Sequence, residues 1–274
     1  LHALSAVVLN IAPDHLDWHT NMADYVRCKI RIYNASVLKV VPRDDIYIDI
    51  QDKTAISFGK HPPTNASEYG VQIYAKQPCF MLGLNMLCPV DSVPNLGAGS
   101  LTNYLAAFAL LQPLNIPMSD IVHACQTFTG LAHRCEKLIL PRDIIVYNDS
   151  KATNSAAMLG ALIALEKYDR IILIAGGEYK EAHVPLFPEY IKKKIKMVLL
   201  FGKDKKLLYD SWYEQVLCHC VSTLEEATQR AFADYAPHDC IILSPACASY
   251  DQFTNFEERG RMFKHYVLEN SISP

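Results

Sequence analysis

From about residue 144 to the end of the chain, short apolar runs alternate with segments whose apolar residues recur every three or four positions. The runs predicted to be strands are Ile144–Tyr147, Ile171–Ala175, Met197–Phe201, Val216–Val221 and Cys240–Ser244. The segments between and after them predict helices near 155–167, 187–194, 207–214, 222–236 and 255–270. Ser222-Thr223-Leu224-Glu225 has the form of a capping box and opens one of these helices. Repeated strand–helix units of this length predict a parallel sheet wrapped by helices.

Polar clusters follow three of these predicted strands. They are Asn148–Asn154, Gly176–Lys180 and Ser244–Ser249. Ligands of parallel sheets bind at the carboxyl ends of the strands. The agreement of three separate clusters therefore predicts one ligand site at that edge.

The first 130 residues have a different pattern. Ala6–Asn10 reads as a strand and Met22–Ser36 as a helix, followed by β-rich runs and two further helices. The β-rich runs are Ile46–Ile50, Ala55–Phe58 and Gly70–Ala75, and the helices are Leu101–Leu111 and Met118–Phe128. We interpret this as one strand–helix unit of an α/β sheet plus a small antiparallel piece. Because a lone unit cannot cover both faces of a parallel strand, this half is expected to be incomplete, with the domain boundary at 130/131.

Composition allows a sizeable core and argues against nucleic acid as a partner. Half of the 274 residues are hydrophobic, 20% are charged, and the net charge is −3. The one dense basic run, Lys192-Lys193-Lys194 with Lys196, is typical of the solvated face of a helix. No apolar stretch approaches the roughly 20 residues that a spanning helix requires, so no membrane span is expected.

The nine cysteines favour reduced thiols and a cytoplasmic protein. They are scattered, odd in number and never spaced C-x-x-C. Cys218-His219-Cys220 could bind a metal from one face of a strand, but no second pair of ligands is evident.

Three groups of motifs resemble the Mur ligases and occur in the family's order along nearly the whole chain. They are Asn10–Asp17 with Lys29; His133–Glu136 with Asn148–Asn154; and Leu243–Phe253 with Asn255–Gly260. D-S-K-A-T-N and S-P-A-C-A-S-x-D-Q-F are similar to the D-glutamate-adding member in particular. The resemblance implies an α/β protein with a Rossmann-like C-terminal domain (131–274). Residues 1–130 would be the remainder of a P-loop-type central ATPase domain.

In the first motif, His15 and Lys29 are the candidate catalytic residues and metal ligands. A neutral imidazole among carboxylates can ligate a divalent cation, and the resemblance implies that His15 helps to hold Mg²⁺; His15 could instead cap a turn. Lys29 would ordinarily be a surface lysine. The resemblance implies that it is carbamylated and that the carbamate positions Mg²⁺, which would require a desolvated amine of lowered pKa.

The second motif supplies candidates for ATP. Arginine can bridge phosphate oxygens and a strand-end aspartate suits ribose hydroxyls, which makes Arg134 and Asp149 nucleotide-binding candidates. Lys151 is a point charge that can lie beside a transferring phosphoryl group, and we expect it to be catalytic. The resemblance assigns the same roles and adds Asn103 as a contact to the nucleotide.

Four positions match those that bind D-glutamate in the family: Thr153, Lys180, Ser249 and the backbone at Phe256. A dicarboxylic amino acid needs two anion sites, and an amine, hydroxyl groups and helix N-terminal N–H groups can provide them. For Thr153 and Ser249, ordinary turn or cap chemistry is the alternative.

The chain departs from the family's pattern in several places. The G-x-H-N-x-x-N segment, which contacts adenine, reads Gly97–Asn103, with Gly99 and Ser100 in place of His and Asn. Ser100 remains a suitable helix N-cap, and Asn103 is retained. Cys135 replaces an aromatic residue, and the loop at Gly176–Lys180 has a bulkier tip.

No G-x-x-x-x-G-K-[ST] phosphate loop occurs in the sequence. We therefore expect a fragment that lacks the family's UDP-binding first domain and the front of its ATPase domain, and that is inactive alone. The expected reaction of the whole protein is ATP-dependent addition of D-glutamate to UDP-N-acetylmuramoyl-L-alanine through an acyl phosphate. The alternatives are a sister Mur ligase, a folylpolyglutamate synthase, or a non-catalytic module that binds nucleotides or amino acids.

Overall fold

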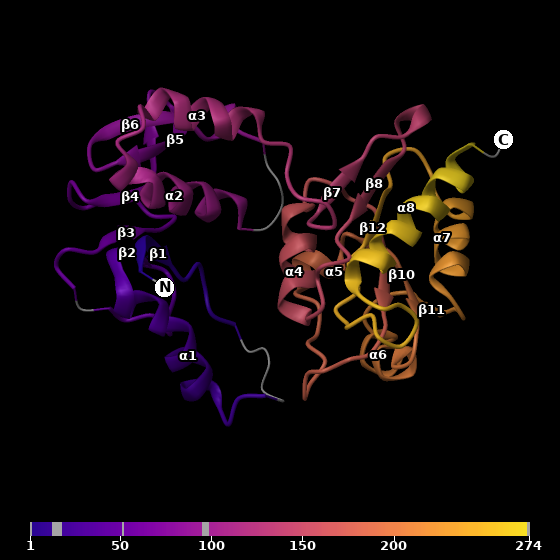
Figure 1. The fold of residues 1–274 in the computed structure, drawn as a ribbon. Coiled ribbons are helices and arrows are strands. Elements are labelled where there is room, and N and C mark those ends of the chain that lie inside the picture. The colour runs from indigo at the N-terminus through magenta and orange to yellow at the C-terminus, as the bar shows by residue number, and fades with distance from the viewer. Residues whose placement is uncertain (1, 13–17, 51, 95–98, 273–274) are drawn as a thin grey trace. The chain divides into compact units, whose positions relative to one another are not determined.

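The computed structural model describes residues 2–12, 18–50, 52–94 and 99–272, which form two compact units (Figure 1). The described residues through Thr129 make the N-terminal unit, and those from Gly130 onward make the C-terminal unit. Each unit is built on a six-stranded sheet. Among the described residues, no helix is both long and apolar enough to cross a membrane.

The sheet of the N-terminal unit is mixed and continuous. Its strands, in spatial order, are β1 (Ala3–Val7), β2 (Ser36–Pro42), β3 (Ile56–Phe58), β4 (Glu68–Tyr74), β5 (Gln77–Leu82) and β6 (Asn85–Pro89). β1 to β4 pair in parallel, and β4, β5 and β6 pair antiparallel. The predicted antiparallel piece is present, but the prediction of a single strand–helix unit was wrong, because four strands, β1 to β4, pair in parallel before it. Ile46–Ile50 forms no strand; instead Ile48 is buried in a cluster beside the first helix.

The helices of this unit are α1 (Met22–Ile30), α2 (Ser100–Leu111) and α3 (Met118–Thr127), with short 3₁₀ segments at Arg31–Ala35, Val90–Ser92 and Gln112–Leu114. The helix predicted to reach Ser36 ends earlier, because the chain tightens into a 3₁₀ turn and Ser36 begins β2. α2 begins after Gly99, which adopts a left-handed conformation (φ 78°) as the N-cap, so Ser100 is the first helical residue and not the cap.

Two helices cover this sheet with apolar side chains. Leu105 and Phe108 of α2 are fully buried, and the Phe108 ring meets that of Phe80 edge-on at 5.6 Å. Beside α1, the buried Tyr33 hydroxyl donates to Val40 O and accepts from Val8 N–H, both at 2.9 Å. This one side chain links β1 to β2, and its burial raises its pKa.

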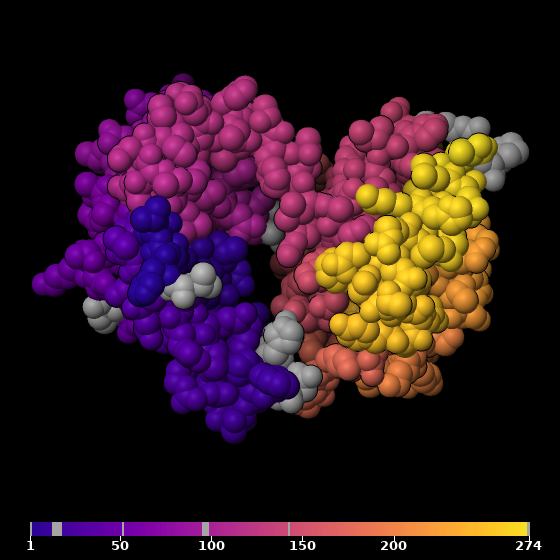
Figure 2. Space-filling view, in the orientation of Figure 1, coloured from indigo at the N-terminus to yellow at the C-terminus, as the bar shows by residue number. Residues whose placement is uncertain are grey.

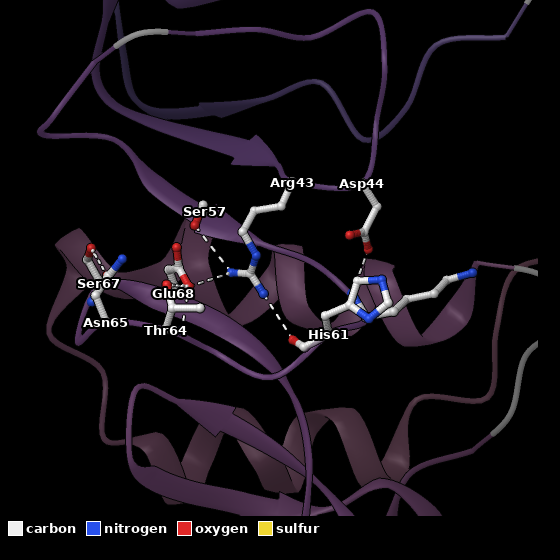
Figure 3. A network of polar contacts seen from close by, with 9 residues as sticks. Arg43, Asp44, Ser57, His61, Thr64, Asn65, Ser67 and Glu68 are labelled. Atoms are coloured by element: carbon white, nitrogen blue, oxygen red, sulfur yellow. Dashed lines mark hydrogen bonds and ion pairs between the residues drawn. The ribbon is translucent and has the colours of Figure 1, made fainter.

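A polar network fixes the loop between β3 and β4 (Figure 3). Arg43 donates to His61 O at 3.0 Å and lies 3.5 Å from a Glu68 carboxylate oxygen. The same oxygen accepts from Thr64 N at 2.6 Å and from the Thr64 hydroxyl at 3.0 Å. Burial raises the pKa of Glu68, but these hydrogen bonds and Arg43 outweigh it and the net pKa is lowered. The network therefore holds the loop through an ionised carboxylate.

The C-terminal unit contains the predicted parallel sheet. Its strands, in spatial order, are β11 (Cys218–Cys220), β10 (Ile195–Phe201), β9 (Ile171–Gly176), β12 (Cys240–Leu243), β8 (Ile145–Asn148) and β7 (Glu136–Leu138). All neighbours pair in parallel except β7, which is antiparallel to β8. The five predicted strands are thus confirmed, with bounds that differ by a few residues.

Helices cover both faces of this sheet. They are α4 (Ser155–Ala164), α5 (Glu189–Lys192), α6 (Lys205–Trp212), α7 (Leu224–Ala233) and α8 (Phe256–Ile272). Along β9, Leu173 packs in a core with α4, α5 and α6, while Ile172 and Ile174 pack in a second core with α7 and α8. Burial on both faces explains why β9 reads as an uninterrupted apolar run. The yellow atoms of α8 form part of the surface visible in Figure 2.

Two local predictions in this unit need correction. Thr223, not Ser222, is the N-cap of α7: its hydroxyl accepts from Glu226 N, while the Glu226 carboxylate accepts from Ser222 N. The carboxylate therefore bonds the residue before the N-cap and not the N-cap itself, which differs from the reciprocal pair of a capping box. The basic run is not one helix face, because Lys196 lies in β10 and pairs with the buried Asp239 at 2.6 Å.

Candidate functional site

The polar segments that follow β8, β9 and β12 meet at one edge of the C-terminal sheet, as predicted. These three strands are neighbours in the order β9-β12-β8. Asp149 N donates to Leu243 O at 2.8 Å, and Gly176 N donates to Pro245 O at 2.9 Å. The segments beyond the strand ends are therefore joined directly by backbone hydrogen bonds.

Asp149 follows β8 at this edge and is 8% exposed. One carboxylate oxygen accepts from the Ser244 hydroxyl at 2.8 Å, and the other accepts from Cys135 N at 3.0 Å. Burial raises the pKa of Asp149 to about 6, against the opposing effects of these two hydrogen bonds and of Arg134. Each oxygen retains a lone pair for a ligand donor.

A completely buried arginine binds two of these segments. Arg259, on α8, donates to the Ser150 hydroxyl at 3.0 Å, to Ser150 O at 2.8 Å and to Cys247 O at 2.9 Å. Burial lowers the pKa of this guanidinium to about 10. A planar group with five donors in fixed directions can satisfy several carbonyls at once. Sequence reasoning gave Arg259 no role.

His133 and Gly260 pack together behind the first turn of α8. Asn148 donates its side-chain N–H to Gly260 O at 2.9 Å, and its amide nitrogen lies 3.1 Å from His133 Nδ1. A Cβ on Gly260 would lie 2.2 Å from His133 Nδ1, so only glycine fits against the ring. Burial lowers the pKa of His133, which favours the neutral imidazole.

Lys151 lies over the ring of Phe256, with its Nζ 4.0 Å from the ring centroid. Its backbone N–H donates to His133 O at 3.1 Å. The Ser150 hydroxyl donates to Phe256 O at 2.8 Å, which ties the loop after β8 to the start of α8. The structure therefore brings together Asp149, Lys151 and Phe256, three of the residues singled out from sequence.

The glycine loop after β9 passes close to two other backbones. Gly177 has φ 133°, and a Cβ there would lie 2.3 Å from Ala248 O. Next to it, Glu178 and Ala248 exchange two backbone hydrogen bonds of 2.9 Å. Gly177 therefore allows this loop to pair with the A-C-A-S segment.

Lys180 and Ser249 occupy different environments on these two paired segments. The Lys180 side chain is 50% exposed and its Nζ lies 3.0 Å from a Glu178 carboxylate oxygen, which makes a surface ion pair. Ser249 is 2% exposed, and its carbonyl accepts from Gln252 N and Phe253 N. Thr153 is partly buried and donates its N–H to Lys151 O at 2.8 Å.

Other predicted site residues are exposed or lie outside the described residues. Arg134 is exposed in the C-terminal unit. In the N-terminal unit, Asn103 is exposed on α2, and Lys29 is exposed on α1 with its Nζ 5.1 Å from the centroid of the Tyr25 ring. His15 falls outside the described residues.

Each of the two units matches the model of a known protein domain. The model of the Mur ligase middle domain matches residues 2–111, and that of the Mur ligase, glutamate ligase domain, matches residues 133–247. The chain belongs to the Mur ligase family.

Two relatives named for the same reaction align with nearly the whole chain. A UDP-N-acetylmuramoylalanine–D-glutamate ligase from Pseudoalteromonas translucida is 34% identical over 98% of this chain. A protein of the same name from Pseudomonas aeruginosa is 36% identical, also over 98% of the chain. The chain spans about 60% of the length of the curated relatives it matches (59% and 61% for these two).

Solved structures agree with the fold. MurF from Acinetobacter baumannii superposes with a TM-score of 0.67 at 15% identity, covering 98% of this chain and 60% of its own. Escherichia coli FolC, solved with DHPP and ADP, also gives 0.67, at 18% identity and covering 97% and 62%. At such identities the likeness supports the fold only.

Proposed function

We propose that this protein acts in the ATP-dependent addition of D-glutamate to UDP-N-acetylmuramoyl-L-alanine, a step of peptidoglycan precursor synthesis. The observation that carries the proposal is the alignment of 98% of the chain, at 34–36% identity, with relatives named for that reaction. The activity would be cytoplasmic; all nine cysteines, each within the described residues, are free thiols, which favours a reducing compartment.

In this proposal Arg134 and Asp149 bind the nucleotide. Arg134 is exposed and free to reach a phosphate, whereas Asp149 is held rigidly by Ser244 and Cys135. With a pKa of about 6, Asp149 is mostly ionised at neutral pH and can accept hydrogen bonds from ribose hydroxyls. Asn103, exposed on α2, is the proposed contact to the adenine side of ATP.

D-glutamate would bind where the glycine loop meets the A-C-A-S segment and α8. Lys180 would pair with a carboxylate of the amino acid in place of Glu178, an exchange that costs little because the existing pair is solvent-exposed. The Ser249 and Thr153 hydroxyls and the backbone at Phe256 are the proposed partners of the remaining polar groups. The first turn of α8 favours an anion there.

Lys151 is the proposed catalytic residue of the C-terminal unit. The ring of Phe256 holds its ammonium near the start of α8, where a positive charge can stabilise a phosphoryl group or an acyl phosphate. The amine of D-glutamate would then attack the activated carbonyl and release phosphate. When bound, Mg²⁺ would neutralise charge on the phosphates.

The Mg²⁺ assignment to His15 and Lys29 stays a prediction. Mg²⁺ prefers oxygen ligands, and a lysine ammonium has none. The exposed Lys29 amine would become a suitable ligand only after carbamylation. A carbon-13 resonance of carbamate on the chain in labelled bicarbonate, absent from Lys29→Met, would test it directly.

Calorimetric titration of the chain with D-glutamate and L-glutamate tests the amino-acid site. We expect selective binding of D-glutamate that Lys180→Ala removes. The control is Lys193→Ala, which removes an exposed lysine that pairs with Glu189 just after α5. It should leave the affinity for D-glutamate unchanged. Preference for another amino acid would favour a sister ligase or a folylpolyglutamate synthase, and binding of D-glutamate that is indifferent to Lys180→Ala would contradict the proposed site.

A further inference from the structure

Three potential metal ligands converge in the N-terminal unit, outside the edge described above. One ligand atom each from His19, Asp24 and Cys28 lies within 4.8 Å of the other two. His19 Nδ1 is 3.2 Å from an Asp24 carboxylate oxygen. Within residues 2–12, 18–50, 52–94 and 99–272 this is the one such group, so Cys218-His219-Cys220 is not part of another.

Helix α1 creates this arrangement. Asp24 and Cys28 are four residues apart and therefore project from the same face. Asn21 caps the helix by accepting from Asp24 N at 3.0 Å, which fixes the turn that carries His19. The His19 ring lies 5.1 Å from the ring of the buried Tyr25. The imidazole is thus held against the helix on the side where the carboxylate and the thiol project.

The group is accessible but not fully solvated. The side chains of His19 and Asp24 are 16% and 22% exposed, and Cys28 is exposed. One Asp24 oxygen pairs with Arg27, and the other faces His19. The contact with Arg27 orients the Asp24 carboxylate, as outer-shell partners of metal ligands do. The positive charge of Arg27 also weakens the attraction of this carboxylate for a metal ion. The Lys29 Nζ lies 5.1 Å from the centroid of the Tyr25 ring, the ring that also contacts His19.

We propose that His19, Asp24 and Cys28 form a binding site for a divalent ion of the Zn²⁺ class, separate from the Mg²⁺ chemistry of the proposed function. Imidazole and thiolate ligands favour Zn²⁺ and Co²⁺, whereas Mg²⁺ prefers oxygen. Three protein ligands leave the fourth tetrahedral position to water. Bond lengths of about 2.0–2.3 Å place tetrahedral ligand atoms roughly 3.3–3.8 Å apart, so closure requires a movement of about 1 Å by the exposed Cys28 side chain.

Titration of the chain with Co²⁺ at neutral pH, under a non-thiol reductant, tests the site. We expect one ion per chain, with a thiolate-to-cobalt absorption band that Zn²⁺ abolishes and millimolar Mg²⁺ does not. Cys28→Ser should remove the band. His19→Ala should weaken binding by more than about tenfold, since even outer-shell groups are worth 10–100-fold. Arg27→Met, which removes the competing cation, should tighten it.

The matched control is Cys220→Ser, which removes an exposed cysteine of the C-terminal unit and should leave the band intact. Circular dichroism of each variant verifies folding. Absence of a thiolate band, or a band that persists in Cys28→Ser, overturns the proposal. These measurements need no nucleotide or amino acid, so their failure would not bear on the proposed ligase function.

Discussion

Replacement of Arg259 by methionine tests what holds the carboxyl edge of the C-terminal sheet together. Methionine fills much of the same volume but cannot donate to Ser150 O, the Ser150 hydroxyl or Cys247 O. Leaving three buried acceptors without these donors costs about 1–3 kcal/mol each, or roughly 3–9 kcal/mol together.

The substitution also removes an unfavourable contribution to stability, the desolvation of the buried guanidinium. The buried guanidinium has its pKa lowered from 12.5 to about 10, which corresponds to a desolvation cost of about 3 kcal/mol that methionine does not bear. The middle of the first range is about 6 kcal/mol, so subtracting this gain leaves an expected net destabilisation of about 3 kcal/mol. Arg259→Lys should not rescue it, because one ammonium cannot reproduce the planar fork.

The chain offers a probe specific to this unit. Of its two tryptophans, Trp212 is fully buried in the C-terminal unit and Trp18 is exposed in the other. In a Trp18→Phe background, urea unfolding followed by Trp212 fluorescence reports on the C-terminal unit alone. Arg261→Met, an exposed change on the same helix, should shift the free energy of unfolding by less than about 0.5 kcal/mol. If Arg259→Met has an equally small effect, the fork does not stabilise the edge and the reasoning fails.

Three further changes test neighbouring contacts. Gly260→Ala should lower the free energy of unfolding by about 1–3 kcal/mol despite the better helix propensity of alanine, because its Cβ would meet His133. Adding His133→Ala should recover part of this loss. If the effects of the two substitutions are strictly additive, the clash is contradicted. Asp149 has a folded pKa of about 6, above its usual 3.8, so its contribution to the stability of the unit should fall by up to about 3 kcal/mol as pH rises from about 4 to 6. Asp149→Asn should remove this contribution, and a stability difference between the two proteins that does not change from pH 4 to 6 would refute it. Asp239→Asn should cost up to about 3–5 kcal/mol, because it leaves Lys196 without its buried partner; a neutral effect in the same urea assay would show that the pair does not stabilise the fold.

Five of the six strands of the C-terminal sheet could be predicted from sequence because they are apolar runs bounded by polar breaks. β7 was missed because it has three residues, none of them buried. In the N-terminal unit the same approach failed at β2, which begins directly after a 3₁₀ turn, so no break separates helix from strand. For Ile46–Ile50 the error is the opposite: a strand was predicted where the structure has none. Its alternating isoleucines imitate a strand, but only Ile48 is buried, against the cluster beside α1. Tertiary packing decided both segments.

The polar residues of the candidate site could be anticipated, but the residue that joins them could not. An arginine on a helix normally reads as an exposed side chain. Two of the three partners of Arg259 are backbone carbonyls, those of Ser150 and Cys247, and Ser150 is 109 residues away in sequence. Backbone acceptors have no residue-type signature, so no motif reveals the contact. The contact between the Lys151 ammonium and the Phe256 ring could not be predicted for another reason: it depends on α8 returning to the loop after β8.

These contacts also constrain how the proposed site can work. Lys151 follows Ser150, and the Ser150 hydroxyl donates a hydrogen bond to the carbonyl of Phe256. The proposed catalytic group, Lys151, and the proposed amino-acid-binding backbone at Phe256 therefore share one rigid support, the segment around Ser150. Arg259 binds that support to the backbone of Cys247, two residues before Ser249. A loss of this arginine should therefore displace Ser249 together with Asp149 and Lys151, the two neighbours of Ser150 in the chain. Binding of nucleotide and of D-glutamate would then weaken in parallel, whereas Lys180→Ala, at a solvent-exposed ion pair, would affect D-glutamate alone.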